Sequence, residues 1–209
     1  MEKGKLRGKP KERIRKSVVA FNAEGINKTE SIYLGNYNSR DLSIKMARGN
    51  STDPIGMYNE LIKYCKEEDI KNEYGDKIYL FLDTDCREDK IDEIKRLLKK
   101  KDNDIQIIYS VLTFEVWYLN HFVFSTKEYL NNKSIIDELK KHLGDYSKSK
   151  NYFEKLNDKI NDAIKNSILQ EEYHKNNSIK KELYECNPYT NVYKDIEEIM
   201  MIKNKNESE

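Results

Sequence analysis

The chain has 209 residues, of which 38 are basic and 37 acidic, so its formal net charge is only +1. This near balance gives no overall field that would indicate a nucleic-acid partner. The length allows one domain with an adequate core, and three widely spaced cysteines without a CxxC pair argue against a disulfide framework or a zinc site. No stretch approaches the roughly 20 apolar residues of a membrane span, and the N-terminus has no apolar signal-peptide core. We therefore expect a cytoplasmic protein without membrane association.

The N-terminal segment is much more basic than the rest of the chain. Residues 1–16 carry eight basic and two acidic side chains, a net charge of +6. Such a segment can follow the phosphates of a nucleic acid. The simpler interpretation, a solvated leader, also remains open. In either case we expect a basic tail that precedes the folded domain.

The next part of the chain alternates predicted strands and helices. An apolar run over 17–23 predicts a strand buried on both faces, and a short helix that begins near Asn27 or Lys28 and includes Leu34 follows. Residues 41–47 alternate polar and apolar side chains, which is typical of a more exposed strand. The helix after it has Pro54 at the favoured first position. This order of elements predicts an α/β fold.

Two further strands are predicted at 77–83 and 105–110. Between them lies an amphipathic helix that begins at Glu88. The alternation of strands and helices implies βαβ crossovers and therefore a mostly parallel sheet of four strands flanked by helices.

Beyond residue 112 the hydrophobic period becomes helical. Predicted helices cover 114–122, 130–143, 153–167 and 192–200. We therefore expect an α/β domain over 17–112, a C-terminal helical extension over 113–202 that packs on the sheet, and a polar tail over 203–209.

Three carboxylates end the predicted strands and provide the best clue to function. Glu24 follows the first strand, and Asp83 and Asp85 follow the third. The carboxyl ends of parallel strands meet at one edge of a sheet, where open α/β proteins place their ligand sites. Clustered carboxylates repel one another unless a positive charge lies between them, and a divalent cation is a common solution. In an extended chain Asp83 and Asp85 would point to the same side, about 6.5–7 Å apart.

An aspartate pair with this spacing also occurs in several other kinds of site. A calcium loop counted from Asp83 would need glycine and glutamate where Glu88 and Ile94 stand, so it is excluded. A haloacid-dehalogenase-type phosphatase places its DxD after the first strand rather than the third. A nucleotide-sugar transferase would leave Glu24 unexplained. Asp85 could also serve only as a cap for the following helix.

Four sequence blocks resemble a known family. Glu24-Gly25 after the first strand and DxD after the third resemble the TOPRIM domain, and the blocks more specifically resemble the RloB family of bacterial defence proteins. The blocks are Glu24-Gly25 with Thr29-Glu30 and Tyr33, Ser110 with Phe114-Glu115, Trp117 and His121-Phe122, Tyr146-x-Lys148, and Asn187-Pro188 with Thr190 and Val192-Tyr193. The resemblance covers nearly the whole chain.

The resemblance implies a TOPRIM nuclease that works with an AAA-type ATPase partner in antiphage defence. It implies that Asp83 and Asp85 hold Mg²⁺, for which Mn²⁺ can substitute, and that Glu24 is a general acid or base or a ligand of a second metal ion. Thr29 and Glu30 would support the loop around Glu24.

Other candidate residues each have an alternative structural role. Glu115 could be a fourth acidic group or only a helix N-terminal charge. Arg48, Arg87 and Lys148 could each contact a phosphate, or each could be an ordinary surface cation. His121 could donate into the site but is favoured as a packing residue. The aromatic residues at helical spacing are favoured as core, and the Asn187–Tyr193 block fits helix capping.

One departure from the family pattern is expected to change local structure. Residues 111–113 replace the family's Asn-Pro-Cys, so the turn after the fourth strand lacks its proline. We expect a differently shaped turn there.

Two functions follow as hypotheses. The first is a Mg²⁺-dependent nuclease that cleaves RNA, such as tRNA, or DNA. The second is a non-catalytic interaction subunit that docks on the ATPase partner through its helical half.

Overall fold

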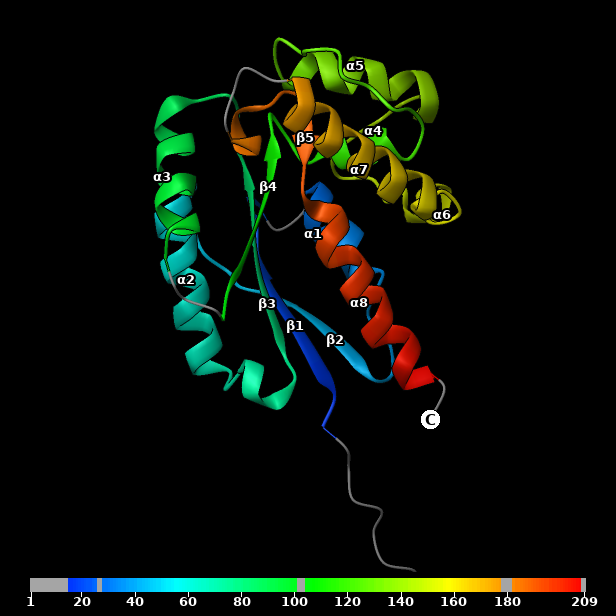
Figure 1. The fold of residues 1–209 in the computed structure, drawn as a ribbon. Coiled ribbons are helices and arrows are strands. Elements are labelled where there is room, and N and C mark those ends of the chain that lie inside the picture. The colour runs from blue at the N-terminus through cyan, green and yellow to red at the C-terminus, as the bar shows by residue number, and fades with distance from the viewer. Residues whose placement is uncertain (1–14, 26–27, 101–103, 178–181, 208–209) are drawn as a thin grey trace, which may run out of the picture.

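The protein folds around one five-stranded sheet. The computed structural model describes residues 15–25, 28–100, 104–177 and 182–207. The strands are β1 (Ser17–Asn22), β2 (Leu42–Met46), β3 (Lys77–Asp83), β4 (Gln106–Val111) and β5 (Tyr189–Thr190), and their order in the sheet is β2-β1-β3-β4-β5. The first four strands are parallel to one another, and β5 runs antiparallel to β4 (Figure 1).

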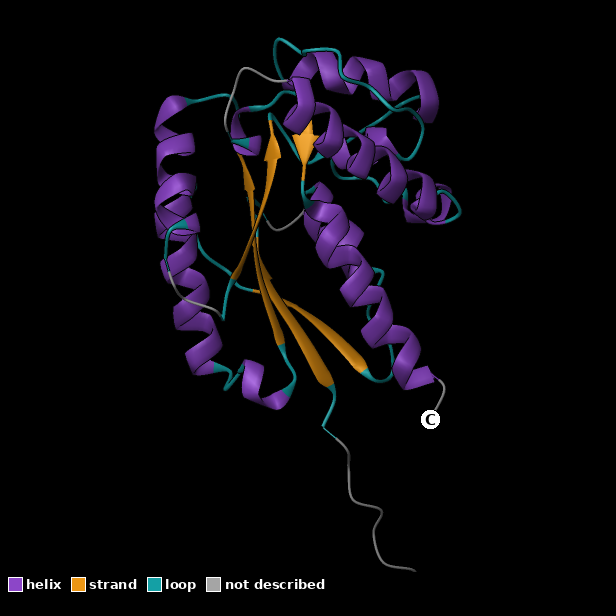
Figure 2. Ribbon diagram, in the orientation of Figure 1, coloured by secondary structure: helices purple, strands orange, loops and turns teal. Residues whose placement is uncertain are grey.

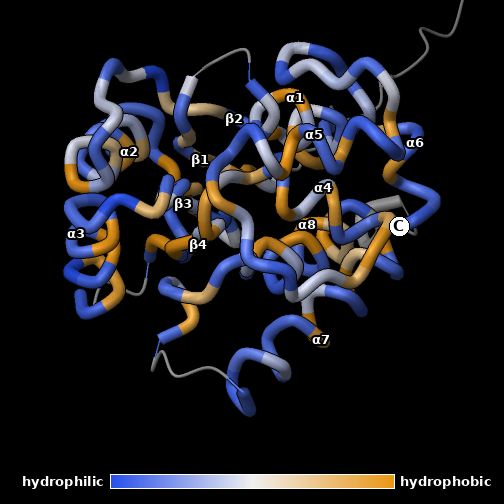
Figure 3. Tube along the Cα trace, turned by 90° about the horizontal axis from the view of Figure 1, so that it is seen from above, coloured by the Kyte–Doolittle hydropathy of each residue, from blue (hydrophilic) through white to orange (hydrophobic). Residues whose placement is uncertain are grey.

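Helices cover both faces of the sheet. The helices are α1 (Thr29–Gly35), α2 (Pro54–Glu67), α3 (Glu88–Leu98), α4 (Glu115–Asn120), α5 (Asn132–Leu143), α6 (Phe153–Asn157), α7 (Ile160–Asn177) and α8 (Val192–Glu207), with short 3₁₀ turns at Asn72–Tyr74 and Leu183–Glu185. One face carries α2 and α3, and the other carries α1 and the helices α4 to α8 (Figures 1 and 2). In Figure 3, α3 shows its hydrophobic residues on one side and polar residues on the other.

The apolar runs build the two core layers because successive side chains of a strand point to opposite faces. In β3, Tyr79 and Phe81 belong to the cluster that contains α4 and α8, whereas Ile78, Leu80 and Leu82 belong to the cluster that contains α2 and α3. A central strand of a parallel sheet is therefore apolar on both faces, as its sequence indicated.

The predicted mixed α/β fold with a mostly parallel sheet is confirmed, but the prediction of four strands is wrong. The fifth strand, β5, lies in the block that was expected only to cap a helix. It is two residues long, and it pairs through Ser110↔Thr190 and Val111↔Tyr189. So short a strand has no hydrophobic period that could reveal it.

The predicted boundaries are confirmed for the third strand and change elsewhere. The third strand is found at the predicted residues, Lys77–Asp83. The helix expected over 153–167 is two helices, α6 and α7, and α8 continues through most of the expected polar tail. Of the basic tail, residues 1–14 lie outside the described residues, while the Arg15 guanidinium donates to both Asp76 oxygens at 2.7 and 2.8 Å.

Within the described ranges, no helix combines the length and apolar character needed to span a bilayer.

Candidate functional site

Acidic residues collect at the carboxyl ends of three neighbouring strands. Glu24 follows β1, Asp83 and Asp85 lie at the end of β3, and Glu115 begins α4 after β4. Because β1 pairs with β3 and β3 with β4, these chain ends lie side by side. This is the edge at which open α/β sheets bind their ligands.

The loop that carries the aspartates is held by Thr84, a fully buried residue. The Thr84 amide donates to the Ser110 carbonyl at 3.0 Å, and the Thr84 hydroxyl accepts from the Leu112 amide at 3.0 Å. The Asp85 amide donates to the Leu112 carbonyl at 3.1 Å. The loop after β3 and the turn after β4 therefore form one hydrogen-bonded unit.

The chain is not extended at Asp85, so the separation of Asp83 and Asp85 that was expected for an extended chain does not apply. Asp85 and Cys86 have φ angles of 48° and 52°, in the left-handed region. Aspartate tolerates this region because its short polar side chain can form local hydrogen bonds. The chain turns sharply after Thr84, and the two aspartates lie in different surroundings.

Asp85 joins Glu24 through the ammonium of Lys90. The Lys90 Nζ donates to Asp85 Oδ2 at 2.8 Å and also to Glu24 Oε1, and the Lys90 side chain is only 8% exposed. The Asn132 amide of α5 donates to Asp85 Oδ1 at 2.8 Å. Asp85 therefore binds side chains from α3 and α5 rather than capping α3, whose N-cap residue Arg87 forms no side-chain cap.

A second group forms around Glu115, which is completely buried. Its Oε1 accepts from the Thr29 hydroxyl at 2.8 Å and from the Tyr146 hydroxyl at 2.7 Å. Its Oε2 accepts from Thr113 and pairs with the Lys148 ammonium at 3.2 Å. Burial tends to raise the pKa of Glu115, but Lys148 and the three hydroxyl donors outweigh burial and lower it.

Among the acids at this sheet edge, Asp83 and Glu30 are the ones whose charge is least favoured. Burial raises the pKa of Asp83 well above its usual value, and the charges of Glu30 and Glu115 raise it further against the opposing effect of Lys148. Burial is also the main reason that the pKa of Glu30 rises to about 7, with a further contribution from Glu115. Perturbed carboxylates at a ligand-binding edge are candidates for function.

The predicted metal ligands are thus neighbours, but Asp83 belongs to different surroundings from the Glu24 and Asp85 pair. Across the described part of the chain, no set of three or more His, Cys, Asp or Glu side chains is arranged to hold a metal ion. The assignment of Asp83, Asp85 and Glu24 as metal ligands stays a prediction.

The remaining candidates lie in varied surroundings. Arg48 and Arg87 are exposed, and Arg87 donates to Asp89 at 3.1 Å. Lys148 contacts Glu115, as described above. The ring of His121 is buried, its Nδ1 lies 2.9 Å from the Trp117 carbonyl, and burial lowers its pKa to about 4.

These contacts place His121 among packing residues, as the sequence favoured. Trp117 and Tyr118 are also buried in the core. Neither aromatic side chain is therefore available to stack on a base.

Sequence reasoning missed Lys90, Asn132 and Tyr146 as site residues. Lys90 had one usable signal, because a lysine in the first turn of α3 stands at the helix end that disfavours cations. Tyr146 lies in the recognised Tyr146-x-Lys148 block. Asn132 had no sequence signal, because its contact joins residues 47 positions apart.

The fold and this edge define an α/β protein with a mostly parallel five-stranded sheet and a candidate acidic site at the carboxyl ends of its strands. A family model described as RloB-like protein matches residues 22–199, which is most of the chain. The chain therefore belongs to the RloB-like protein family. No curated protein and no solved structure gives a significant match.

The turn that departs from the family pattern has an unusual backbone. Leu112 has a φ angle of 75°. Proline is restricted to φ near −65°, so a proline at residue 112 could not adopt this conformation. The turn after β4 therefore has a shape that the family's Asn-Pro-Cys sequence would not allow at the same positions.

Proposed function

We propose that this protein is a TOPRIM-like, Mg²⁺-dependent nuclease that cleaves phosphodiester bonds in RNA, such as tRNA, or in DNA. In this proposal it is a cytoplasmic effector of bacterial antiphage defence with an AAA-type ATPase partner. The observation that carries the proposal is the gathering of Glu24, Asp83, Asp85 and Glu115 at one sheet edge. Membership of the RloB-like family supports it.

The donor set fits a hard divalent cation. Carboxylate oxygens are the ligands that Mg²⁺ prefers, and Asp83, Asp85 and Glu24 would hold it. When bound, Mg²⁺ would supply Lewis-acid stabilisation of the phosphodiester and activation of water. The Lys90 ammonium now pairs with two of these three carboxylates, so we expect it to release them for binding.

The protein's own side chains suit proton transfer and phosphate binding. Glu24 is partly exposed, so a substrate can reach its carboxylate. Glu30, whose pKa is about 7, is close to the value that favours proton exchange at neutral pH. Lys148 is about 40% exposed beside Glu115 and can direct its charge toward a bound phosphate.

A cleavage assay tests the proposal. Purified protein, with and without its ATPase partner, is incubated with tRNA, single-stranded and duplex substrates in Mg²⁺ or Mn²⁺. We expect cleavage that Asp83→Asn abolishes and that Asp92→Asn, an exposed change on α3, leaves intact. Cleavage that persists unchanged in Asp83→Asn would refute the assignment of this site.

A second candidate function is a non-catalytic subunit that docks on the ATPase partner through its helical half. The pairing of Lys90 with Glu24 and Asp85 favours it, because this ammonium balances both carboxylates without a metal ion. Phage resistance is the measurement that separates the two functions. Resistance retained by a triple alanine variant of Glu24, Asp83 and Asp85 would favour the docking subunit, and loss of resistance in a folded triple variant would favour the nuclease.

A further inference from the structure

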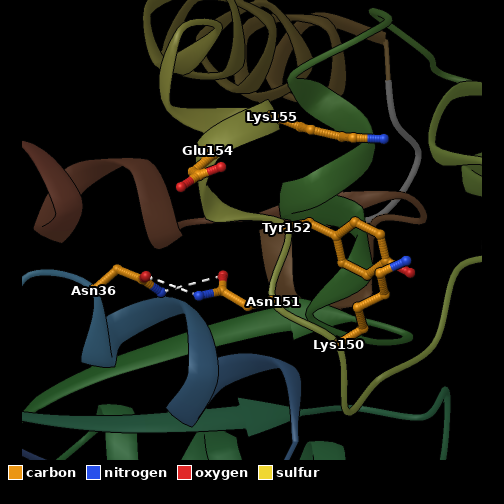
Figure 4. A pocket seen from close by; sticks show the side chains of 6 residues that line it. All are labelled: Asn36, Lys150, Asn151, Tyr152, Glu154 and Lys155. Carbon is orange, nitrogen blue, oxygen red and sulfur yellow. Dashed lines mark hydrogen bonds between the residues drawn. The ribbon is translucent and has the colours of Figure 1, made fainter.

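Two hollows on the surface are large enough to be considered as binding sites. The larger, of about 320 Å³, is lined by Asn36, Lys150, Asn151, Tyr152, Glu154 and Lys155. In Figure 4 the Asn36 and Asn151 side chains bond each other, at 2.9 Å. None of the acidic-site residues lines this hollow. The smaller hollow includes Glu24 in its lining and is therefore connected to the candidate site.

The smaller hollow lies at the carboxyl ends of β1 and β2. It measures about 170 Å³ and is lined by residues 22–25, Lys28, and residues 46, 47 and 49–52. We call it the β1–β2 hollow. Its position at the carboxyl ends of two parallel strands lies on the edge at which open α/β sheets bind their ligands.

The walls of the β1–β2 hollow are held in place by hydrogen bonds to the sheet and to α2. The Ala47 amide donates to the Phe21 carbonyl at 2.8 Å, and the Asn22 side chain donates to the Met57 carbonyl at 2.9 Å. Glu60 Oε1 accepts from the amides of Asn50 and Ser51, each at 3.0 Å. The hollow is therefore formed before any ligand arrives.

Gly49 allows the loop after β2 to approach Glu60 closely. A Cβ atom at residue 49 would lie 1.8 Å from Glu60 Oε2, so a larger residue would push the Glu60 side chain away. That shift would weaken the bonds of Glu60 Oε1 to the amides of Asn50 and Ser51. Glycine at residue 49 therefore keeps this half-buried carboxylate as the anchor of the loop.

The lining selects a neutral group with hydrogen-bonding edges. Asn50 and Thr52 offer side-chain amide and hydroxyl groups, and the half-buried Met46 offers apolar surface. Lys28 and Glu24 bring opposite charges to the lining, so it has no net attraction for a phosphate, and a single carboxylate is too few ligands for a metal ion. A nucleobase combines an apolar face with hydrogen-bonding edges and matches this lining.

The size of the hollow restricts the ligand further. Sites for whole small molecules usually occupy about 300–1,000 Å³, so 170 Å³ suits one planar group. A base inside a duplex is stacked and paired and could not enter, whereas a splayed base in a loop or single strand could.

We propose that the β1–β2 hollow is a subsite for one unpaired nucleobase next to the scissile phosphodiester. This proposal rests on the proposed nuclease function for its position beside Glu24. It adds a substrate class, because it requires an unpaired nucleotide at the cleavage site in either RNA or DNA.

The test measures binding without cleavage. Fluorescein-labelled hairpins with an unpaired loop, one of RNA and one of DNA, and a fully paired duplex of equal length are titrated with the full chain in EDTA at 150 mM salt. We expect the looped probes to bind at least about tenfold more tightly than the duplex, and the RNA and DNA arms report which sugar is preferred.

Matched variants assign the effect to the hollow. Asn50→Leu adds branched bulk and removes the side-chain amide, while the backbone bond of residue 50 to Glu60 is kept. The control is Asn157→Leu, at an exposed asparagine that does not line the hollow. We expect Asn50→Leu to weaken loop binding about tenfold and Asn157→Leu to leave it unchanged. Equal binding by the two variants, or equal binding of loop and duplex by the unaltered chain, would overturn the subsite.

The result separates this proposal from the nuclease proposal. Loop-specific binding that Asn50→Leu weakens, together with no cleavage in Mg²⁺, would leave the subsite and refute the nuclease. Cleavage with a KM and loop affinity unchanged by Asn50→Leu would leave the nuclease and refute the subsite.

Discussion

A buried acid on α7 and two acids at the sheet edge have opposite electrostatic surroundings. Glu171, on α7, accepts from the hydroxyls of Tyr189 and Tyr193, both at 2.7 Å, and from the ammonium groups of Lys175 and Lys194 at 2.6 and 2.9 Å. Burial tends to raise the pKa of Glu171, but these four donors outweigh it and lower the pKa to about 2.

At the sheet edge the balance is reversed for two acids. The half-buried Asp83 and the buried Glu30 lie close to the buried Glu115, and the pKa of each is raised. Lys148 is their main opposing charge, but it is also the ion-pair partner of Glu115. Glu171 has enough donors and joins α7 to β5 and α8, whereas Asp83 and Glu30 have too few and are kept at a cost to stability where a ligand can compensate them.

The largest effect that would sharpen this comparison is expected for Asp83→Asn. Under the proposed function, cleavage should fall by at least about a hundredfold. The free energy of unfolding at pH 8 should rise, because an amide carries no charge for burial and Glu30 to oppose. Cleavage rates and urea denaturation measure the two effects. A variant that keeps its activity and loses stability would place Asp83 with the structural acids.

Glu171→Gln should lower stability and leave cleavage unchanged, the reverse of Asp83→Asn. Its free energy of unfolding at pH 7 should fall by about 3 kcal/mol, because Lys175 and Lys194 lose the carboxylate that they share, while cleavage stays unchanged. Because the folded-state pKa is lowered, this stabilisation is present above about pH 4.5 and is lost as the pH falls toward 2. Urea denaturation across this pH range, with Glu172→Gln as the exposed control, provides the measurement. An equal fall in the free energy of unfolding of Glu172→Gln would show that the four donors do not stabilise Glu171 specifically.

Glu30 should give the protein the opposite pH dependence. Its folded-state pKa of about 7 exceeds the unfolded value, so the folded state holds the proton more tightly and stability falls as the pH rises from about 4.5 to 7. We expect Glu30→Gln to remove roughly 2 kcal/mol of this decline. Glu154→Gln, an exposed change, should retain the full decline. Parallel declines in both variants would show that Glu30 does not titrate in this range.

The smallest effect is expected for Lys90→Met. Without metal this variant should lose about 1 kcal/mol of stability, because Glu24 and Asp85 lose their shared cation. Binding of Mn²⁺, measured by calorimetry, should tighten about tenfold because the ammonium no longer competes for the same oxygens. Lys95→Met, an exposed change on α3, is the matched control. Weaker Mn²⁺ binding by Lys90→Met than by the control would show that Lys90 helps to organise the site.

The sequence predicted the features that depend on local pattern. The apolar run at Lys77–Asp83 gave the boundaries of β3 and placed two acids at its end. Family membership followed from motif blocks spread along the chain and is confirmed by the match to residues 22–199.

Features that depend on distant contacts could not be predicted. The left-handed turn at Asp85 arises because Thr84 bonds to Leu112 across 28 residues, and Lys90 reaches Glu24 across 66. Hydrophobic period carries no information about such pairs. The strand β5 was missed because it pairs with β4, about 80 residues earlier in the chain.

The path of α8 has a practical consequence. This helix begins beside β5 near the acidic edge and runs back along the sheet, and Figure 1 shows its end on the same side of the molecule as the start of β1. Its Glu198 accepts a hydrogen bond from the Tyr79 hydroxyl at 2.8 Å, which ties the helix to the early part of β3. A surface or fluorophore attached beyond α8 or before β1 would therefore leave the acidic edge facing solution, which suits immobilised measurements of nucleic-acid and partner binding.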